Sequence, residues 1–377
     1  MTTAPNDPAT KDVVICGGGV IGAAIAYYLG KRGVRSTIIE ADAVASGASG
    51  AAAGLLSPPP LATTTEPPYE LRVRGFEMHE ELAETLPAES GVDYSFSRDR
   101  RVQLATTEDE ERRLRAAAET ARAAGRSVEW FDAAGVTQLC SWIDRPGRGG
   151  VVGEPVGQLD PYRYTLALVA AAEQMGATVR SGSVSGLAQA DGRVTGVVVG
   201  GAVIPADAVV VAMGPWSIDA GSWLGFDVPV EPLKGQIVRV KPAGDLVPFG
   251  FGYNSNYVTT KEGGLVFIGT TEEHAGFDVA TTDEARDEIL RFGMMFASVL
   301  GEAELVEQTA CLRPLSADGL PIMGRVPGLA GVYLATGHGR QGILMSPPSG
   351  QAIADLIVDG ATDCIDLAPF DPARFAS

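Results

Sequence analysis

The sequence is most constrained by a short stretch near its start, where an apolar run stops at three consecutive glycines. Val13-Val14-Ile15 precedes Gly17-Gly18-Gly19, and the apolar, uncharged stretch Val20–Gly30 follows directly. β-Branched residues favour a buried strand, whereas consecutive glycines permit a tight turn. The pattern therefore predicts a strand, a turn and a helix in immediate succession. A membrane span is the alternative for a stretch of this length, and the internal glycines argue against it.

The glycine spacing matches the G-x-G-x-x-G pattern of dinucleotide-binding turns. In such a turn Gly17 would permit the bend, Gly19 would let the backbone approach a pyrophosphate, and Gly22 would allow close helix–strand packing. A second apolar strand ends at Glu40, whose carboxylate would accept hydrogen bonds from a ribose diol. The helix N-terminus adds N–H donors for phosphate oxygens. We therefore predict a dinucleotide site here.

The stretch that follows Glu40 favours FAD over NAD as the dinucleotide. Residues 41–60 are nearly all Gly, Ala, Ser and Pro, apart from Leu55-Leu56. An NAD domain would continue into another βα unit, whereas small residues suit a backbone lying flat against an extended cofactor. No metal site is expected, because the four cysteines and three histidines are scattered along the chain.

Composition limits the partners and the compartment. The 377 residues are 45% hydrophobic, which is sufficient for about two domains. The formal net charge is −18 and no dense Lys/Arg run occurs, which argues against nucleic acid and anionic membrane surfaces. The N-terminus is polar, lacks an apolar signal core and is expected to be disordered over residues 1–9. Together with the absence of a CxxC pair, these features favour a reducing, cytoplasmic setting.

The rest of the chain alternates between helical and strand patterns. Thr107 and Glu110 form a predicted capping box, and Asp160-Pro161 marks the start of another helix. The predicted elements are helices at 67–86, 106–125, 161–175 and in the 280s, a hairpin at 191–205, a strand at 208–213, antiparallel strands between 231 and 270, and a strand, glycine-rich loop and helix at 331–360. This order predicts an α/β protein in which an antiparallel region interrupts a parallel cofactor sheet.

Motifs along nearly the whole chain resemble the D-amino-acid oxidase (DAO) family of FAD-dependent oxidoreductases. The sequence looks closest to the glycine oxidase and sarcosine oxidase branch of that family. The motifs that carry the resemblance occur in this order: DVVICGGGVIGAAIAYYL, IIE, SGAAAGLL, LDPYRYTLAL, VVVAMGPWS, LKGQ, CLRPLSADGLPIMGR and TGHGRQGILMSPPSG.

The resemblance implies two interleaved domains. One is a glutathione-reductase-type, Rossmann-like FAD domain, and the other is an α+β substrate domain built on a mixed, largely antiparallel sheet. We place the FAD domain at residues 10–90, 150–217 and 308–372. The substrate domain is placed at residues 91–149 and 218–307.

The resemblance also implies an activity. The expected reaction is oxidation of the C–N bond of a small amino acid or N-methyl amino acid, of the glycine, sarcosine or D-amino-acid type, by hydride transfer to flavin N5. The imine then hydrolyses, and O2 reoxidises the flavin to give H2O2. The alternatives are a dehydrogenase that passes electrons to a quinone or partner protein, and the flavin subunit of a heteromeric complex. The expected partner is a small amine that carries a carboxylate, and a homo-oligomer is compatible with this scheme.

Three residues match the family's substrate-binding positions, and a fourth lies beside such a position. Arg313 would pair with the substrate carboxylate, since a guanidinium holds a carboxylate by two hydrogen bonds. A salt bridge from Arg313 to Asp318 across the following turn is the alternative. Tyr257 would line the active site or be plain core, and Arg340 would lie near the entrance or cap its loop. Glycine oxidase has a second tyrosine where this chain has Gly252, so the adjacent Tyr253 is included as a candidate.

The remaining candidates concern the cofactor. Cys311 matches a position where the sarcosine oxidase branch links a cysteine to the flavin; a small buried hydrophobe is the alternative, and we expect FAD to be held without a covalent bond. His338 would face the flavin or be structural. Val179 would meet the adenine through its backbone. The glycine motif and the resemblance together assign to FAD the residues Gly17, Gly19, Val20, Ile21, Gly22, Glu40, Ser49, Ala53, Gly54, Leu55, Val179, Gly214, Gly337, Gly339, Arg340, Gln341, Gly342, Ile343 and Leu344.

Overall fold

A computed structural model describes residues 12–57 and 67–376 of the chain. The expected disorder of residues 1–9 and the prolines at 58–60 lie outside these ranges. The apolar segment near the start forms strand β1 (Val13–Cys16), a turn and helix α1 (Val20–Lys31), as predicted. No helix within the described ranges is both long and apolar enough to cross a membrane.

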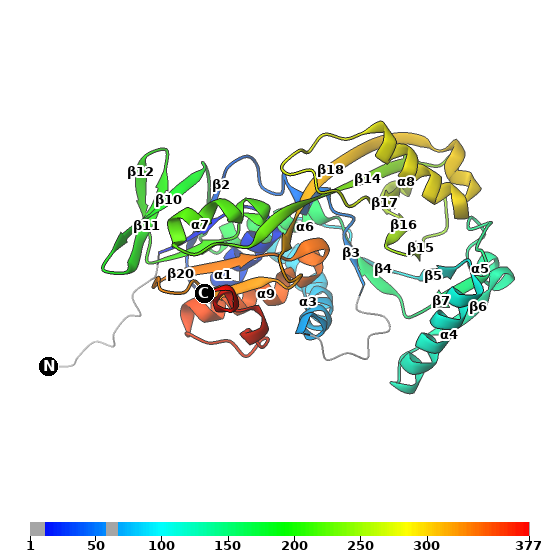
Figure 1. The fold of residues 1–377 in the computed structure, drawn as a ribbon, viewed down its shortest axis with the longest axis horizontal. Coiled ribbons are helices and arrows are strands. Elements are labelled where there is room, and N and C mark those ends of the chain that lie inside the picture. Colours follow the sequence, from blue (N-terminus) through cyan, green and yellow to red (C-terminus); the bar gives the residue numbers. More distant parts are fainter. Residues whose placement is uncertain (1–11, 58–66, 377) are drawn as a thin grey trace.

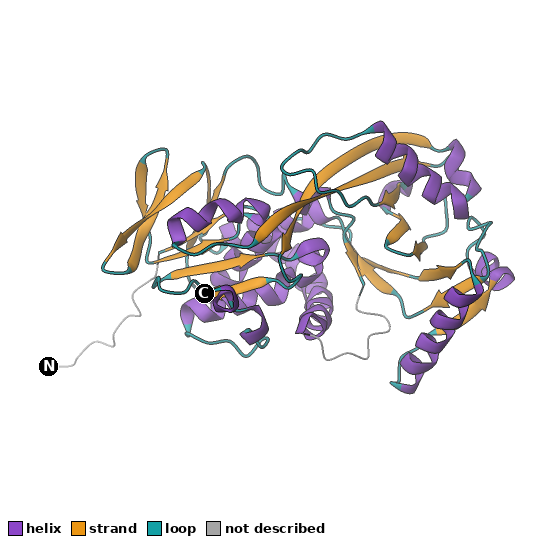
Figure 2. Ribbon diagram, in the orientation of Figure 1, coloured by secondary structure: helices purple, strands orange, loops and turns teal. Residues whose placement is uncertain are grey.

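A six-stranded sheet forms the core of the cofactor region (Figures 1 and 2). β1 lies near its middle and is buried on both faces, which explains why its sequence is continuously apolar. Every pairing in the sheet is parallel except that of β19 with β20. In spatial order its strands are β19 (Ile322–Arg325), β20 (Val332–Thr336), β13 (Ala208–Val211), β1, β2 (Ser36–Glu40) and β9 (Thr178–Ser181).

Helices cover one face of this sheet and a small antiparallel sheet covers the other (Figure 1). Val13 and Ile15 pack toward the helices, whereas Val14 and Cys16 pack toward the small sheet, because successive side chains alternate between faces. The helices are α1, α3 (Pro67–Ser90), α6 (Pro161–Gln174) and α9 (Gly342–Val358). The small sheet contains β10 (Val184–Ala190), β11 (Arg193–Val199) and β12 (Ala202–Pro205), with the 3-10 helix Gly214–Ala220 and α7 (Gly221–Leu224) beside it.

An eight-stranded mixed sheet forms the second region, at the right of Figure 1. All of its pairings are antiparallel except that of β5 with β15. In spatial order the strands are β18 (Glu304–Ser316), β14 (Val230–Lys241), β17 (Val266–Gly269), β16 (Asn256–Thr260), β15 (Gly250–Tyr253), β5 (Arg101–Ala105), β7 (Gly149–Val152) and β6 (Glu129–Asp132). Its outer helices are α4 (Glu108–Ala123), α5 (Ala133–Leu139) and α8 (Asp283–Phe296).

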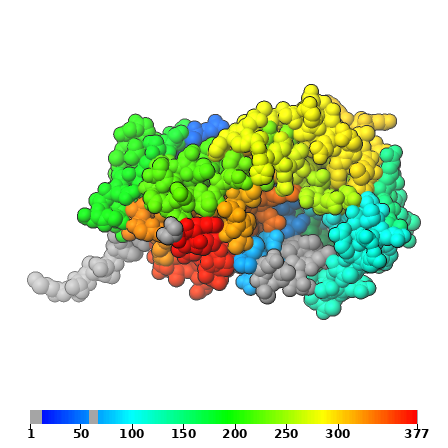
Figure 3. Space-filling view, viewed as in Figure 1, coloured from blue at the N-terminus to red at the C-terminus, as the bar shows by residue number. Residues whose placement is uncertain are grey.

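The two regions interleave along the chain, and the predicted fold class is confirmed. The long pair β14 and β18 extends from the cofactor region to the far end of the second sheet (Figure 1). Figure 3 shows the segment around α8, in yellow, at the surface above the α4 segment, in cyan. Short strands β3 (Leu55–Leu56), β8 (Val156–Gln158) and β4 (Ser97–Asp99) form a sheet between the two regions.

The domain boundaries themselves stay a prediction, and the second sheet extends past two of them. β18 remains in that sheet to Ser316 rather than leaving it at residue 308, and β7 ends at Val152. The predicted helix starts, which depend on residues close together in the sequence, are confirmed. The Thr107 capping box is formed, and the Asp160 side chain accepts a hydrogen bond from the backbone N–H of Arg163 at the start of α6.

Candidate active site

One cavity of about 1220 Å³ runs between the six-stranded sheet and the eight-stranded sheet. Its volume exceeds the range typical of small-ligand pockets, so it has room for a dinucleotide and a substrate together. Most of the predicted site residues line it. They are Gly17, Gly19, Val20, Ile21, Glu40, Ser49, Ala53, Gly54, Leu55, Gly214, Tyr257, Arg313, Gly339, Arg340, Gln341, Gly342, Ile343 and Leu344.

The glycine turn between β1 and α1 has the geometry that the motif requires. Gly17 has a φ of 111°, which an L side chain rarely adopts, and a Cβ there would overlap the carbonyl oxygen of Ala212. A Cβ at Gly22 would overlap the carbonyl oxygen of Gly17, so only glycine lets the helix approach the turn this closely. The Val20 N–H donates to Ser49 Oγ at 2.9 Å, which ties the helix N-terminus to the small-residue run.

Glu40 ends β2 beside this turn. Its Oε2 accepts from the Gly18 N–H at 2.6 Å, and its Oε1 accepts from the Asp42 N–H at 3.0 Å. These bonds fix the carboxylate at the cavity wall, and each oxygen retains a lone pair for a ribose hydroxyl. The small-residue run continues along the wall to Gly54, whose φ of 65° again favours glycine.

The 3-10 helix Gly339–Gln341 and the first turn of α9 form the opposite wall, and α3 packs behind that first turn. His79 Nε2 lies 2.8 Å from the Ile343 carbonyl oxygen, and His79 is fully buried. A Cβ at Gly75 would overlap the Leu344 carbonyl oxygen, so α3 is in direct contact with the backbone of this turn. Burial lowers the pKa of His79 to about 4, and the imidazole is therefore neutral at pH 7.

Arg313 lies on β18 and is only 7% exposed. Its Nη2 donates to Thr270 Oγ1 at 2.8 Å and its Nη1 donates to the Thr271 carbonyl oxygen at 3.2 Å. Burial lowers its pKa, although a guanidinium remains cationic in proteins. The alternative salt bridge to Asp318 is wrong, because Asp318 pairs with Arg374 at 2.8 Å.

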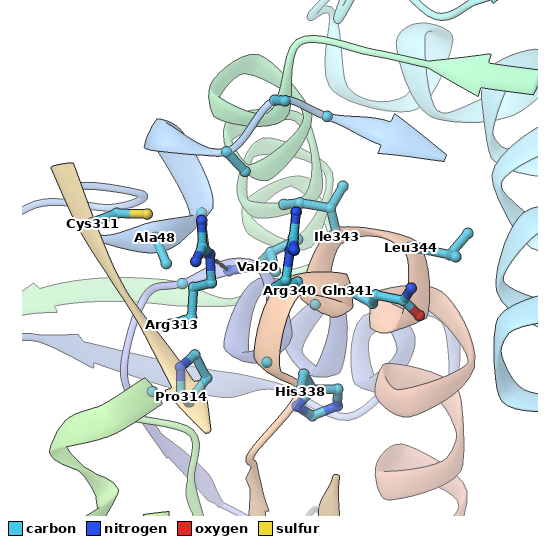
Figure 4. A pocket seen from close by; sticks show the side chains of 18 of the residues that line it. Val20, Ala48, Cys311, Arg313, Pro314, His338, Arg340, Gln341, Ile343 and Leu344 are labelled. Atoms are coloured by element: carbon cyan, nitrogen blue, oxygen red, sulfur yellow. Dashed lines mark hydrogen bonds between the residues drawn. The ribbon is translucent and has the colours of Figure 1, made fainter. Parts of the chain in front are cut away.

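Arg340 extends from the loop before α9 toward the same side as Arg313 (Figure 4). One oxygen of Glu272 lies 3.1 Å from Arg340 Nη1 and 4.0 Å from Arg313 Nη1, so a single carboxylate bridges the two guanidinium groups. Arg340 also donates to the Ser255 carbonyl oxygen at 2.9 Å. The two arginines therefore form a site that a carboxylate can occupy.

Tyr257 lies on β16, and its hydroxyl reaches over Gly269 of the neighbouring strand. Burial raises its pKa to about 12, against the opposing effect of Arg313 and Arg340. The phenol is therefore protonated at neutral pH and can donate a hydrogen bond beside the two arginines.

Cys311 and His338 both line the cavity (Figure 4). Burial raises the pKa of the Cys311 thiol, which keeps it protonated and poorly nucleophilic at neutral pH. His338 Nε2 lies 3.0 Å from Ser349 Oγ, and its Nδ1 is buried without a partner. Its pKa is lowered to about 3 by burial, so this ring is neutral as well.

Two candidates do not line the cavity and are corrected here. Tyr253 neighbours Gly252 on β15 and so points to the opposite face of the sheet, where its hydroxyl lies 3.0 Å from Thr106 Oγ1. Val179 lies within β9, paired with Ile38, and the cavity is lined instead by Val184 at the start of β10. The two remaining predicted residues, Gly22 and Gly337, lie behind the wall and serve close packing.

The sequence reasoning missed two polar side chains on β5. Arg101 and Gln103 line the cavity, while the residues between and beyond them, Val102 and Leu104, belong to the core on the other face. The alternation R-V-Q-L was the available signal for a strand with one polar face. Nothing in that pattern indicates that the polar face borders a cavity rather than solvent.

The residues present fit FAD. The cavity begins at a helix N-terminus without acidic residues in its first turn, where a pyrophosphate is favoured. From there the cavity follows the small-residue run, where few side chains project, to residues 339–344. It ends beside β18, the strand that carries Arg313. Within residues 12–57 and 67–376, no three His, Cys, Asp or Glu side chains gather as a metal site would require.

Comparisons with known proteins agree with this arrangement. Residues 12–356 match the model of the DAO family, described as FAD dependent oxidoreductase. Glycine oxidase of Geobacillus kaustophilus is 33% identical over 96% of this chain and 97% of its own, and a crystal structure of that enzyme superposes with a TM-score of 0.90 at 31% identity. A crystal structure of iminodiacetate oxidase from Chelativorans gives a TM-score of 0.85 at 28% identity, covering 96% of this chain and 98% of that one. The hydrogen cyanide synthase subunit HcnC of Pseudomonas aeruginosa is 28% identical over 97% of this chain and 96% of its own.

Proposed function

The chain belongs to the DAO family of FAD-dependent oxidoreductases, and from that premise we propose that it oxidises the C–N bond of a small amino acid or N-substituted amino acid. The names of the relatives support this range, since glycine is a primary amine and iminodiacetate a secondary one. When bound, FAD supplies the oxidising power by taking up a hydride from the α-carbon. Water then hydrolyses the imine product.

The residues of this chain would act by binding and orientation. Arg313 would hold the substrate carboxylate. Arg340, which Glu272 bridges to Arg313 in this structure, would bind the same carboxylate from the other side. The neutral phenol of Tyr257 would donate a further hydrogen bond. Holding one end of the substrate at a fixed place sets the distance between its α-carbon and the cofactor. This positioning is the main contribution of the protein to the rate.

The observation that carries the proposal is the position of Arg313. A buried guanidinium opens into the same cavity as the glycine turn, and it is hydrogen-bonded only to neutral oxygens. Burying a charge without close compensation is costly, so an anionic ligand is the expected partner. The nearest described carboxylate, that of Glu272, remains 4.0 Å away.

The test is an anaerobic screen in which bleaching of the flavin absorbance reports reduction. Glycine, sarcosine, proline and the D- and L-amino acids would each be mixed with the purified holoenzyme. We expect at least one small amino acid to bleach the flavin within seconds, while the matching carboxylic acid without an amine does not. Failure of every amine to bleach the flavin would refute the proposal.

The electron acceptor is proposed to be O2. Release of H2O2 by the purified chain during turnover would separate an oxidase from a dehydrogenase that uses a quinone or partner protein. The similarity to a hydrogen cyanide synthase subunit favours, as a second candidate, a flavin subunit that needs partner chains. Bleaching that appears only after partner chains are added would select that candidate.

All four cysteines are free thiols, which supports a cytoplasmic location.

A further inference from the structure

The eight-stranded sheet that carries Arg313 places a second arginine, Arg101, in the wall of the cavity. Arg101 lies on β5, which pairs with β15 such that Arg101 faces Gly250 and Gln103 faces Gly252. Both cavity-facing positions of β15 are thus glycines, and no side chain separates β5 from the cavity there. A Cβ at Gly250 would lie 3.2 Å from Arg101 Nε, which shows that the arginine extends across this strand.

Arg101 has almost no partner in the part of the chain that the structure describes. Its Nη1 donates to Ser57 Oγ at 3.2 Å, and its Nε is buried without any acceptor. No carboxylate within residues 12–57 and 67–376 lies within 4.0 Å of it, in contrast to Arg98 three residues earlier, which pairs with Glu80 at 3.0 Å. A partly buried guanidinium without a carboxylate partner, whose Nε is buried and has no acceptor, is a group that an anion would stabilise.

The two arginines are spaced for one small molecule. Arg101 Nε lies over Gly250 of β15, whereas the Arg313 guanidinium lies over Gly235 of β14 and against Thr270 at the end of β17. These positions are two to three strands apart, or roughly 10–14 Å at the usual strand spacing. A molecule with two carboxylates a few bonds apart spans this gap when each lies ~3 Å from its guanidinium.

We propose that Arg101 binds a second acidic group of the substrate, so that the preferred substrates are amino acids with a carboxylate on the side chain or on the nitrogen substituent. This inference rests on the proposed function, because it concerns the far end of the same substrate. Gln103, next to Arg101 on the same face, can donate through its amide to that group. Tyr257 lies between the two arginines and contacts the middle of the substrate.

The test compares acids with their neutral amides of the same shape. The ratio of kcat/KM for aspartate over asparagine, and for glutamate over glutamine, would be measured with each enantiomer on the holoenzyme. We expect a ratio of about 10 to 100 in the wild type, the range of one charge-assisted hydrogen bond. Arg101→Met should bring the ratio close to one, and Arg101→Lys should restore part of it.

Arg100→Met is the matched control, because it removes the same charge from the adjacent, exposed position. It should leave the ratio as in the wild type. A second measurement does not depend on variants: succinate should perturb the wild-type flavin spectrum with an affinity at least tenfold higher than butanoate.

Two outcomes overturn the inference. They are equal affinity of succinate and butanoate, and a ratio that Arg101→Met leaves unchanged. If no amino acid bleaches the flavin at all, the proposed function itself fails, and this result is distinct from bleaching without preference for acids.

Discussion

Arg313 combines a buried charge with a position that the strand register fixes. It pairs with Leu233 of β14, and its guanidinium occupies the space over Gly235 on that same strand. A side chain at residue 235 would displace the Arg313 guanidinium, so this position of Arg313 requires glycine at residue 235. Arg313 therefore has one orientation available, toward the cavity.

We predict that Arg313→Ala leaves FAD bound and raises KM for the substrate about 10- to 100-fold, because one charged hydrogen-bonding partner of the carboxylate is lost. Steady-state kinetics and the flavin absorbance spectrum would measure the two effects. Arg100→Ala, at an exposed position, is the control and should change neither. Unchanged kinetics in Arg313→Ala would remove the arginine from the site.

Glu272 would compete with the proposed substrate carboxylate for the two guanidinium groups. Its carboxylate lies 3.1 Å from Arg340 and 4.0 Å from Arg313, and its side chain is 45% exposed. We predict that Glu272→Gln lowers KM about two- to fivefold, since removing a partly exposed ion pair frees up to ~1 kcal/mol. Glu288→Gln is the control, since this glutamate lies on the same rim and Arg340 pairs with Glu272 instead. A rise in KM would show instead that Glu272 positions Arg340.

At the residue scale, the residues that a motif marked lie at the cavity. The surrounding motif marked Arg313, and the glycine pattern marked the turn between β1 and α1; their roles stay predictions. Arg101 was missed because two adjacent arginines before a short strand look like solvated charge. Only the pairing of β5 with the glycines of β15 shows that Arg101 is partly buried and faces the cavity.

At the element scale, α3 supports the first turn of α9, which lines the cavity. It contacts that turn through Gly75, against Leu344, and through His79, against Ile343. The helix itself was predicted from its pattern, but its function as a brace was not. A contact between residues more than 260 positions apart leaves no mark on either local sequence.

We predict that Gly75→Ala weakens FAD binding at least tenfold and lowers the free energy of unfolding by about 1–3 kcal/mol, because the added methyl group would overlap the Leu344 carbonyl oxygen and displace the helix. Titration of the apoprotein with FAD and urea unfolding would measure these changes. Gly244→Ala is the control, since a methyl group there meets nothing within 4 Å. FAD affinity equal to that of the wild type would contradict the brace.

Faces of strands were the weakest point of the sequence analysis. Tyr253 was favoured for its proximity to a matched position, yet a neighbour in a strand points to the opposite face. Val179 lies within β9, and the chain reaches the cavity only after that strand ends, from Gly182 to Val184. Helix caps, by contrast, depend on contacts within one turn and were predicted correctly at Thr107 and Asp160.

At the scale of the whole molecule, two buried histidines couple stability to pH. The pKa of His79 is lowered from 6.5 to about 4 and that of His338 to about 3, both by burial. Between about pH 6.5 and pH 4 the unfolded chain therefore binds up to two more protons at these histidines than the folded chain does. We predict that the free energy of unfolding decreases as the pH falls from 6.5 toward 4, with a slope that approaches ~1.4 kcal/mol per pH unit for each histidine.

Urea unfolding of the holoenzyme between pH 7.5 and pH 5 would measure this slope. His79→Gln should reduce it by about half, because one of the two titrating groups is removed. His274→Gln is the control, since that ring is exposed. A slope that persists unchanged in His79→Gln would assign the acid sensitivity to other groups.

The central place of β1 has a consequence for synthesis of the protein. One of its neighbours, β2, follows almost at once, but the other, β13, is encoded about 200 residues later. At ~5–20 residues per second, the ribosome needs about 10–40 s to deliver it. During that time an apolar strand has one edge unpaired. Residues 339–344 emerge later still, so FAD can be enclosed only after they have been made.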